Sequence, residues 1–227
     1  MSRLRIHHGD VFRGRHHVLH GGRIETALPA AVAIVGVNGS GKTSLFLHLC
    51  DALLRRKQQA DLHVGDSPAR IAFAPQAPSL PEWLTPAGAA ALYGLDFDRL
   101  HADLPGLHLD EIAGKRFGSM SVGQQQALGV ALAVGRDANL LILDEPFAAL
   151  DFRRRIALID ALAAWKSRDG ERALLLSSQN ASDLVELCEH FVVLRDGRYV
   201  FNGPRDELTG GAIDASTAER KLLQLLT

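Results

Sequence analysis

The chain has 227 residues, of which 47% are hydrophobic, a length that suits one sizeable domain, or one domain with a small insertion, burying its own core. It carries 25 Lys and Arg against 26 Asp and Glu, so no excess of basic charge argues for nucleic-acid binding and no acidic tail argues for a basic partner. No apolar run approaches the roughly 20 residues of a membrane span, and the N-terminus has no signal-peptide core, so we expect a cytoplasmic protein.

Residues 1–30 predict short antiparallel strands, because Leu4-Arg5-Ile6 alternates and the apolar Phe12 and Val18-Leu19 flank a turn. Five of the ten histidines lie here, at His7, His8, His16, His17 and His20. Adjacent histidines on a strand point to opposite faces, so neither His-His pair makes a chelate alone. We interpret these histidines as solvated strand and turn residues rather than as a metal site.

A glycine-rich turn between a strand and a helix is the most informative stretch. Residues 31–35 are apolar and suit a strand buried on both faces, and a helix is expected from Leu45 to about Arg56. Between them lies the pattern G-x-x-x-x-G-K-[ST], whose glycines and backbone N–H groups wrap a polyphosphate at a helix N-terminus. The expected nucleotide-binding residues are Gly36, Asn38, Gly39, Ser40, Gly41, Lys42, Thr43 and Ser44. The ligands are then ATP and Mg²⁺, with Lys42 on the β- and γ-phosphates and the Thr43 hydroxyl on the metal.

The segment after this helix differs in composition, because it is rich in proline. Two short strands at 62–64 and 70–74 precede four prolines, at 78, 81, 86 and 105, that break the chain into short pieces. Helices are expected across 87–93 and from about 109. We interpret residues 78–119 as a helical insertion in a single domain, whose catalytic core is 1–77 and 120–227.

Alternating helices and strands then predict an α/β fold. Helices are expected over 123–136, 153–165, 182–188 and 217–226, and strands over 140–143, 172–177, 191–194 and 199–201, the last two joined by an Asp196-Gly197 hairpin turn. The strand at 140–143 delivers Asp144 and Glu145 at its C-terminal end, where sites form in parallel sheets. Asp144 is placed to hold Mg²⁺, and Glu145 to polarise an attacking water.

The two cysteines, Cys50 and Cys188, lie in apolar runs. We expect small core or half-buried residues of a reduced protein, not a disulfide or a metal pair.

These motifs, in this order, resemble the nucleotide-binding subunit of an ATP-binding cassette (ABC) transporter over nearly the whole chain. Residues 119–126, SMSVGQQQ, resemble the family signature Leu-Ser-Gly-Gly-Gln with Met for Leu and Val for the first Gly, Gln76 resembles the Q-loop glutamine, and 148–151 resemble the D-loop. The resemblance implies a P-loop NTPase (RecA-like) core with an N-terminal antiparallel β subdomain and a small helical insertion. It also implies that Gln76 joins Thr43 and Asp144 at the metal.

In the family, two subunits pair head to tail, with each ATP between the phosphate loop of one and the signature of the other. The resemblance therefore implies that Ser121, Gly123 and Gln124 act on ATP bound to a partner cassette, in a homodimer or a heterodimer. A Ser hydroxyl and free amides at a helix start suit an anion, although Ser121 is equally an ordinary N-cap. An integral membrane permease is the other implied partner, which places the protein on the cytoplasmic face of the membrane.

Three positions depart from the family pattern. Gln179 stands where the family usually has a catalytic histidine, and Gln can donate to a γ-phosphate but cannot be protonated, so slower hydrolysis or tighter dimer retention is expected. Val122 adds a side chain near the phosphate of the partner site. Arg13 stands where the family has an adenine-stacking Tyr, with Phe12 beside it, and either can stack on a base.

The segment around 174–198 resembles exporter cassettes most, with importers remaining open. The insertion would dock on the permease through Trp83 and Leu84, unless Trp83 packs inside the insertion.

Two other classes of function remain open. A soluble ABC ATPase acting on nucleic acid or ribosomes typically has two cassettes and basic surfaces, and a nucleotide-sensing module that barely turns over is kept open by Gln179.

Overall fold

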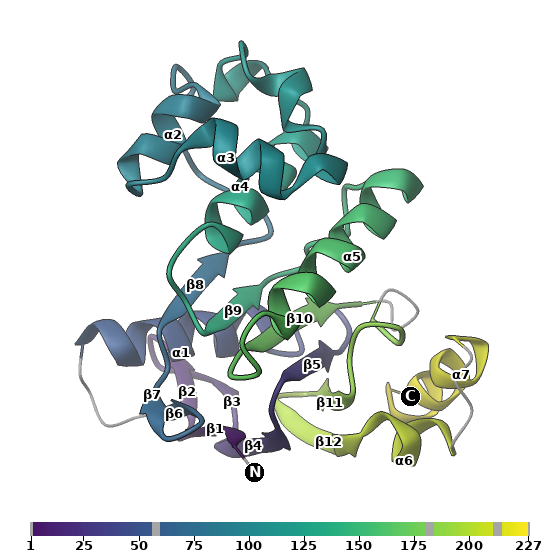
Figure 1. Cartoon of the computed structure of the whole chain (residues 1–227). Helices are drawn as coiled ribbons and strands as arrows, with labels where there is room; N and C mark the ends of the chain where they lie inside the picture. Colours follow the sequence, from purple (N-terminus) through teal and green to yellow (C-terminus); the bar gives the residue numbers. More distant parts are fainter. Residues whose placement is uncertain (1, 56–59, 180–183, 211–214, 227) are drawn as a thin grey trace.

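A six-stranded sheet forms the centre of the molecule (Figure 1). The structure is a computed structural model that describes residues 2–55, 60–179, 184–210 and 215–226. The strand order is β12 (Arg198–Pro204), β11 (His190–Arg195), β5 (Ala30–Val35), β10 (Ala173–Ser178), β9 (Leu140–Leu143), β8 (Ile71–Ala74). All neighbours are parallel except the hairpin of β11 and β12. The carboxyl ends of β5, β10 and β9 therefore meet at one edge of the sheet.

The N-terminal residues form antiparallel strands, as predicted. A four-stranded sheet has the order β4 (Gly22–Ala27), β1 (Arg3–His8), β6 (Ala60–Val64), β7 (Ser67–Pro68). A separate two-stranded hairpin joins β2 (Val11–Arg13) to β3 (His16–Leu19). Together with the central sheet these strands confirm the α/β fold with an N-terminal antiparallel β subdomain.

The central sheet separates two hydrophobic cores, because its strands are apolar on both faces. Along β5, Ala31, Ala33 and Val35 belong to the core that also contains buried residues of α4 (Val122–Val134) and α5 (Phe152–Ser167). The alternate residues Val32 and Ile34 belong to the core shared with α1 (Lys42–Arg55) and the antiparallel sheet. Burial on both faces holds the phosphate loop, which follows β5, on a rigid base.

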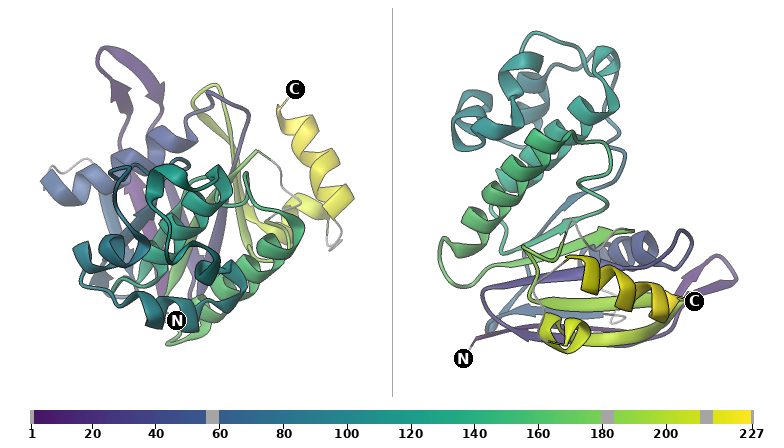
Figure 2. Two further views of the ribbon diagram at one scale, coloured as in Figure 1. Left: turned by 90° about the horizontal axis from the view of Figure 1, so that it is seen from above. Right: turned by 90° about the vertical axis from the view of Figure 1, so that its right-hand side faces the viewer.

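Residues 78–119 are built from short helices and lie on the opposite side of the molecule from the antiparallel sheet (Figure 2). They are α2 (Pro86–Leu92), α3 (Phe97–Asp103) and the 3₁₀ turns η1 (Pro105–Leu107), η2 (Leu109–Ile112) and η3 (Phe117–Ser119). The predicted helix near 109 is thus a single 3₁₀ turn. The sequence reasoning missed α3, which begins where the Asp96 side chain accepts the Arg99 N–H at 2.9 Å. An ion pair between Glu111 and Arg154 joins this segment to α5.

The C-terminal part agrees with the sequence except in two helices. Asp196 and Gly197 both have positive φ, 48° and 69°, as the predicted hairpin turn requires. Residues 184–187 form hydrogen-bonded turns rather than the rest of the helix predicted over 182–188, and 182 and 183 lie outside the described residues. A short helix α6 (Arg205–Thr209) was not predicted, whereas α7 (Ala215–Leu226) was.

The cysteines behave as the composition indicated. Cys50 is half-buried and Cys188 is buried, and neither forms a disulfide. Burial raises the pKa of the Cys50 thiol to about 12 and that of Cys188 further still, so both thiols stay protonated at neutral pH. Among the described residues, no helix has the length and apolar character to cross a membrane.

Candidate functional site

The phosphate loop leaves β5 at the carboxyl edge of the central sheet and runs directly into α1, which begins at Lys42. Gly39 and Gly41 have φ of 81° and 109°, a backbone conformation that L side chains rarely adopt. A Cβ on Gly36 would collide with the Ser40 side chain and the Leu194 carbonyl. These three glycines are therefore required by the local path of the chain.

A pocket of about 300 Å³ opens at this loop. It is lined by the predicted residues Asn38, Gly39, Ser40, Gly41, Lys42, Thr43, Ser44, Gln76 and Glu145, and also by Arg13 and Val18. Gly36 contributes its carbonyl just beneath, as the acceptor for Lys42 Nζ at 2.7 Å. The sequence motif thus gathers into one cavity with the Q-loop glutamine and the second carboxylate.

Lys42 is held by groups that a phosphate could replace. Its side chain is only 6% exposed, and Nζ lies 3.4 Å from Glu145 Oε1 as well as against the Gly36 carbonyl. The Ser40 hydroxyl is also buried in this loop, with no hydrogen-bond partner among the described residues. A buried ammonium with a weakly made ion pair and an unsatisfied hydroxyl both favour an anionic ligand.

Two of the three predicted metal ligands, Thr43 and Asp144, come from separate motifs and are in contact. Thr43 Oγ1 donates to Asp144 Oδ2 at 2.7 Å, and the Ser177 hydroxyl donates to the other carboxylate oxygen, Oδ1, at 2.6 Å. The register explains this, because Leu176 on β10 pairs with Leu143 on β9, which puts Ser177 beside Asp144. A hydroxyl and a carboxylate oxygen in contact are hard oxygen ligands of the kind Mg²⁺ prefers. The donor set therefore fits Mg²⁺ with ATP.

Glu145 has an unusual backbone and a buried side chain. Its φ is 49°, and the residue is 7% exposed. Its N–H donates to the Ser177 hydroxyl at 2.7 Å, and its Oε2 accepts the backbone N–H of Gln179 at 3.3 Å. The ends of two neighbouring strands, β9 and β10, thus fix one carboxylate that lines the phosphate pocket. A positive φ at a non-glycine residue in a site is a form of stored strain.

Gln179 follows β10 and is exposed. It does not line the pocket, although its backbone N–H reaches Glu145. The structure therefore ties the switch position to the second carboxylate through the main chain. A γ-phosphate contact by the Gln179 side chain stays a prediction.

Of the two candidates for stacking on adenine, only Arg13 lines the pocket. Phe12 is 57% exposed and lies against the His17 ring, with centroids 4.9 Å apart. Val18 is the neighbouring residue that sequence reasoning missed, since its strand gave no chemical signal.

The signature residues form a second, separate arrangement at the start of α4. Ser121 is the N-cap: its Oγ accepts the Gln124 N–H at 3.3 Å, and the Gln124 side chain accepts the Ser121 N–H at 3.1 Å. Ser121 and Val122 are exposed, whereas Gly123 is buried where a Cβ would lie 2.5 Å from the Ala149 carbonyl. None of these residues lines the phosphate pocket of its own chain. The capping box confirms the N-cap reading of Ser121.

Gln126, which was not predicted as a site residue, connects the signature helix to the loop after β9. The Gln126 side chain is 2% exposed, donates to the Glu145 carbonyl at 2.6 Å and accepts the Ala149 N–H at 3.1 Å. It links the signature helix to the carboxylate and to the D-loop, whose Asp151 caps α5 by accepting the Arg154 N–H at 3.0 Å. A polar residue inside an otherwise apolar helix stripe was the available signal.

A profile of the ABC transporter family matches residues 25–148. The chain belongs to the ABC transporter family. The phosphonates import ATP-binding protein PhnC 2 of Pseudomonas aeruginosa is 30% identical over 88% of this chain and 85% of its own length. The thiamine import ATP-binding protein ThiQ of Shigella sonnei is 29% identical over 82% of this chain and 85% of its own.

Another relative is longer than the chain. The ABC transporter ATP-binding protein YxlF of Bacillus subtilis is 31% identical over 78% of this chain, which spans 62% of that protein. Solved structures agree in fold. An ATP-binding subunit of an ABC transporter gives a TM-score of 0.77 at 22% identity, covering 98% of this chain and 99% of its own. A bacterial Atm1-family ABC exporter with ATP bound gives 0.73 at 20% identity, covering 96% of this chain and 42% of its own.

The chain is therefore an ATP-binding subunit of the ABC transporter family, an ATPase with the family's fold. The phosphate-loop pocket is the place on it that suits the nucleotide.

Proposed function

We propose that this ABC ATPase binds Mg-ATP in the phosphate-loop pocket and hydrolyses it to drive a separate membrane permease. The observation that carries the proposal is the convergence of Lys42, the Thr43–Asp144 contact and Glu145 on one pocket. Mg²⁺ held by Thr43, Asp144 and, from the pocket wall, Gln76 would neutralise charge on the β- and γ-phosphates.

In the hydrolysis step, this chain's own residues position charge and water. Lys42 moves from Glu145 and the loop carbonyl to the phosphates, which frees one Glu145 oxygen. The freed carboxylate accepts a hydrogen bond from the attacking water and polarises it. The Gln179 N–H on the other oxygen keeps the carboxyl group oriented during this step.

We propose that the second half of each site comes from another cassette. Ser121, Gly123 and Gln124 stand at an exposed helix start outside their own chain's pocket. A helix N-terminus attracts anions, and a head-to-tail dimer would bring it to the γ-phosphate held by the other chain. The exposed Val122 would lie in that interface, being 70% exposed in the single chain.

A mixing experiment tests the paired site. Lys42→Ala removes the phosphate-loop half, and Ser121→Arg blocks the signature half. Each variant alone is expected to be inactive. Random pairing of the two leaves half of the dimers mixed with one intact site each, so about a quarter of wild-type ATPase activity should return. No recovery in mixtures that demonstrably form mixed dimers would contradict sites shared between chains.

We propose that this chain binds the permease through the helical segment 78–119. Trp83 is 68% exposed, so it does not pack inside the insertion. Leu84, the other predicted anchor, is 6% exposed and packs beside Gly88, so that prediction was wrong. Leu92, at 69% exposed, is a second apolar side chain on this segment. An exposed Trp is a typical interface anchor.

The relatives bear on the direction of transport. Two of them are named import proteins, which favours import as a second candidate beside the export that the sequence motifs favoured. Reconstitution in sealed vesicles with a permease that this subunit binds tests this. ATP-dependent uptake of substrate from the side opposite the ATPase indicates import, and loss from the ATPase side indicates export.

A further inference from the structure

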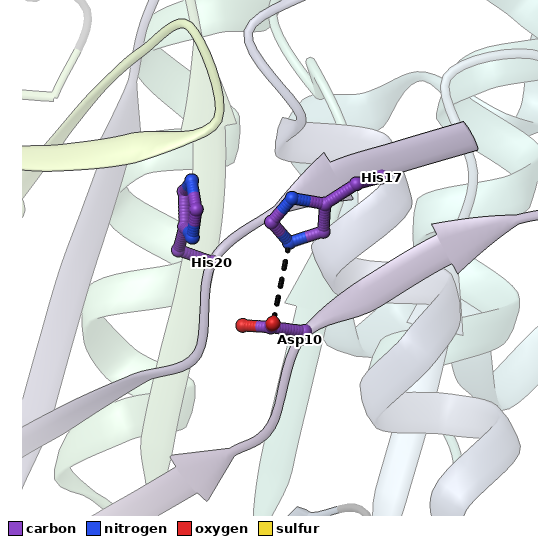
Figure 3. Close-up of side chains that lie close together, drawn as sticks. All are labelled: Asp10, His17 and His20. Atoms are coloured by element: carbon purple, nitrogen blue, oxygen red, sulfur yellow. Dashed lines mark ion pairs between the residues drawn. The ribbon is translucent and has the colours of Figure 1, made fainter.

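A histidine and carboxylate cluster lies at the base of the β2–β3 hairpin, outside the residues used above. Asp10 precedes β2, His17 is on β3, and His20 follows it (Figure 3). One ligand atom from each of the three side chains lies within 4.8 Å of the other two. Among the described residues this is the one group of three or more such side chains that could hold a metal ion.

The backbone of the hairpin creates this convergence. The register shifts between Val11 and Phe12, which pair with Leu19 and His17, so Val18 is an extra residue in β3. Such a bulge re-aims side chains that would otherwise alternate. The cluster is not made of adjacent histidines, since His16 lies outside it. The sequence predicted solvated histidines, whereas His17 and His20 are half-buried and the bulge brings them together with Asp10.

The cluster is oriented by groups around it. The Gly21 N–H donates to Asp10 Oδ1 at 2.7 Å, leaving Oδ2 facing His17 Nε2 at 3.5 Å. Phe12 lies over the His17 ring, and the His20 ring meets it edge-on with centroids 4.3 Å apart. His17 Nε2 is buried with no hydrogen-bond partner among the described residues. It faces Asp10 Oδ2 in an ion pair at 3.5 Å, too far apart for a good hydrogen bond but close enough for both atoms to bind one ion.

We propose that Asp10, His17 and His20 bind a divalent transition-metal ion of the Zn²⁺ class. Imidazole nitrogens favour Zn²⁺ and its neighbours over Mg²⁺ and Ca²⁺, which prefer oxygen ligands. Two histidines and one carboxylate also match the ligand number of a zinc site that keeps one position open for water. The Gly21 N–H on the carboxylate is the outer contact that orients such a ligand.

Binding requires only small movements. Zinc bonds of about 2.0–2.1 Å in a tetrahedron put ligand atoms about 3.4 Å apart, and the widest separation here is under 4.8 Å.

A bound ion would tie the start of β2 to the end of β3. The same hairpin contributes Arg13 and Val18 to the phosphate-loop pocket, and the Val18 carbonyl and Leu19 lie beside Gly41. The metal would thus fix the strand ends next to the nucleotide. The site itself depends on none of the residues assigned to ATP.

Calorimetric titration of the full-length, untagged protein with Zn²⁺ tests the proposal, in excess Mg²⁺ to occupy the oxygen ligands at the phosphate loop. We expect one Zn²⁺ per chain. Asp10→Asn, His17→Ala and His20→Ala should each weaken binding at least about tenfold, since even outer contacts of metal sites are worth that much. Asp10→Asn keeps an oxygen for the Gly21 N–H, so the hairpin should retain its shape.

The matched control is His16→Ala, which removes the adjacent exposed histidine and should leave Zn²⁺ affinity unchanged. Zn²⁺ should also raise the melting temperature of the wild type and of His16→Ala, but not that of Asp10→Asn. Equal weakening by His16→Ala and His17→Ala would overturn the site. So would an absence of Zn²⁺ binding to the folded wild type, or binding that occurs only as two chains associate.

Discussion

The two halves that we propose for the nucleotide site differ in how they are held. The phosphate-loop half is buried and cross-linked: Lys42, Thr43, Asp144, Glu145 and Ser177 connect three strand ends of one sheet. The signature half is a single helix start, where Ser121 and Val122 are exposed and Ser121 and Gln124 cap each other, with one further hydrogen bond from Lys115 Nζ to Gln124 Oε1 at 3.3 Å. The first is preorganised by its own chain. The second is exposed at the surface, where a partner can reach it.

The two halves are nonetheless connected within the chain. Gln126 and Gly123 lie one turn apart on α4 and both touch the loop after β9, through the Ala149 N–H and carbonyl respectively. The start of α4 therefore packs on the loop that follows β9 and the carboxylates. Movement of the helix start would reach Glu145 through the Gln126 hydrogen bond to its carbonyl.

The largest expected effect comes from removing the centre of the buried half. Lys42→Ala should abolish ATP binding or hydrolysis, because the phosphates lose the lysine of the pocket and Glu145 loses its ion-pair partner. Equilibrium binding of a fluorescent ATP analogue and phosphate release measure this. Lys221→Ala, on an exposed position of α7, is the control. Unchanged affinity and turnover in Lys42→Ala would refute the phosphate-loop assignment.

Glu145→Gln separates binding from chemistry within the same half. An amide cannot accept the water proton, so turnover should fall about 10²- to 10⁴-fold while ATP binding persists. The ATP-bound dimer should then accumulate, which gel filtration with ATP and Mg²⁺ detects. Hydrolysis at the wild-type rate would remove Glu145 from the reaction.

Gly123→Ala tests the junction between the halves. The new Cβ would lie 2.5 Å from the Ala149 carbonyl, and forcing such an overlap typically costs about 1–3 kcal/mol. We expect a lower melting temperature together with a several-fold loss of turnover. Gly114→Ala, where a Cβ meets nothing within 4 Å, is the matched control. Equal behaviour of both variants would show that α4 is not held tightly at this loop.

Sequence alone located Lys42, Thr43, Asp144 and Glu145 of the buried half, because they occupy fixed places in one continuous motif and at one strand end, but it did not single out Ser177. The glycines at 39 and 41, Lys42, Thr43 and Asp144 all stand where the pattern predicted. The strands of the central sheet were recognisable for a similar reason, since burial on both faces leaves unbroken apolar runs.

What the sequence did not show depends on packing between distant segments. Gln126 ends the stretch that resembles the signature, but its role depends on contacts with the loop after β9. Leu84 and Trp83 are adjacent and equally apolar, yet only the fold decides that one is buried and the other exposed. The metal-site candidate depends on a one-residue bulge. Local hydrophobic pattern cannot encode these tertiary choices.

The one expected gain of turnover concerns Gln179, at the rim of the buried half. Its backbone N–H already orients Glu145, and every substitution except proline retains that contact. A change of side chain therefore tests the γ-phosphate contact alone. If the side chain reaches the phosphate in the ATP-bound dimer, Gln179→His should raise turnover by up to about tenfold, or about 1.4 kcal/mol off the barrier.

Gln179→Ala provides the comparison, since it keeps the N–H and removes the side chain. With a phosphate contact, turnover should rank His above Gln above Ala, measured as steady-state phosphate release with the permease present. The same three residues at position 179 can be compared in a Glu145→Gln variant, which is expected to hydrolyse ATP far more slowly. There, a phosphate contact should make ATP retention follow the same order, His above Gln above Ala. Equal rates for all three proteins would mean that the switch position acts through its backbone, and that the fold already supplies its whole contribution.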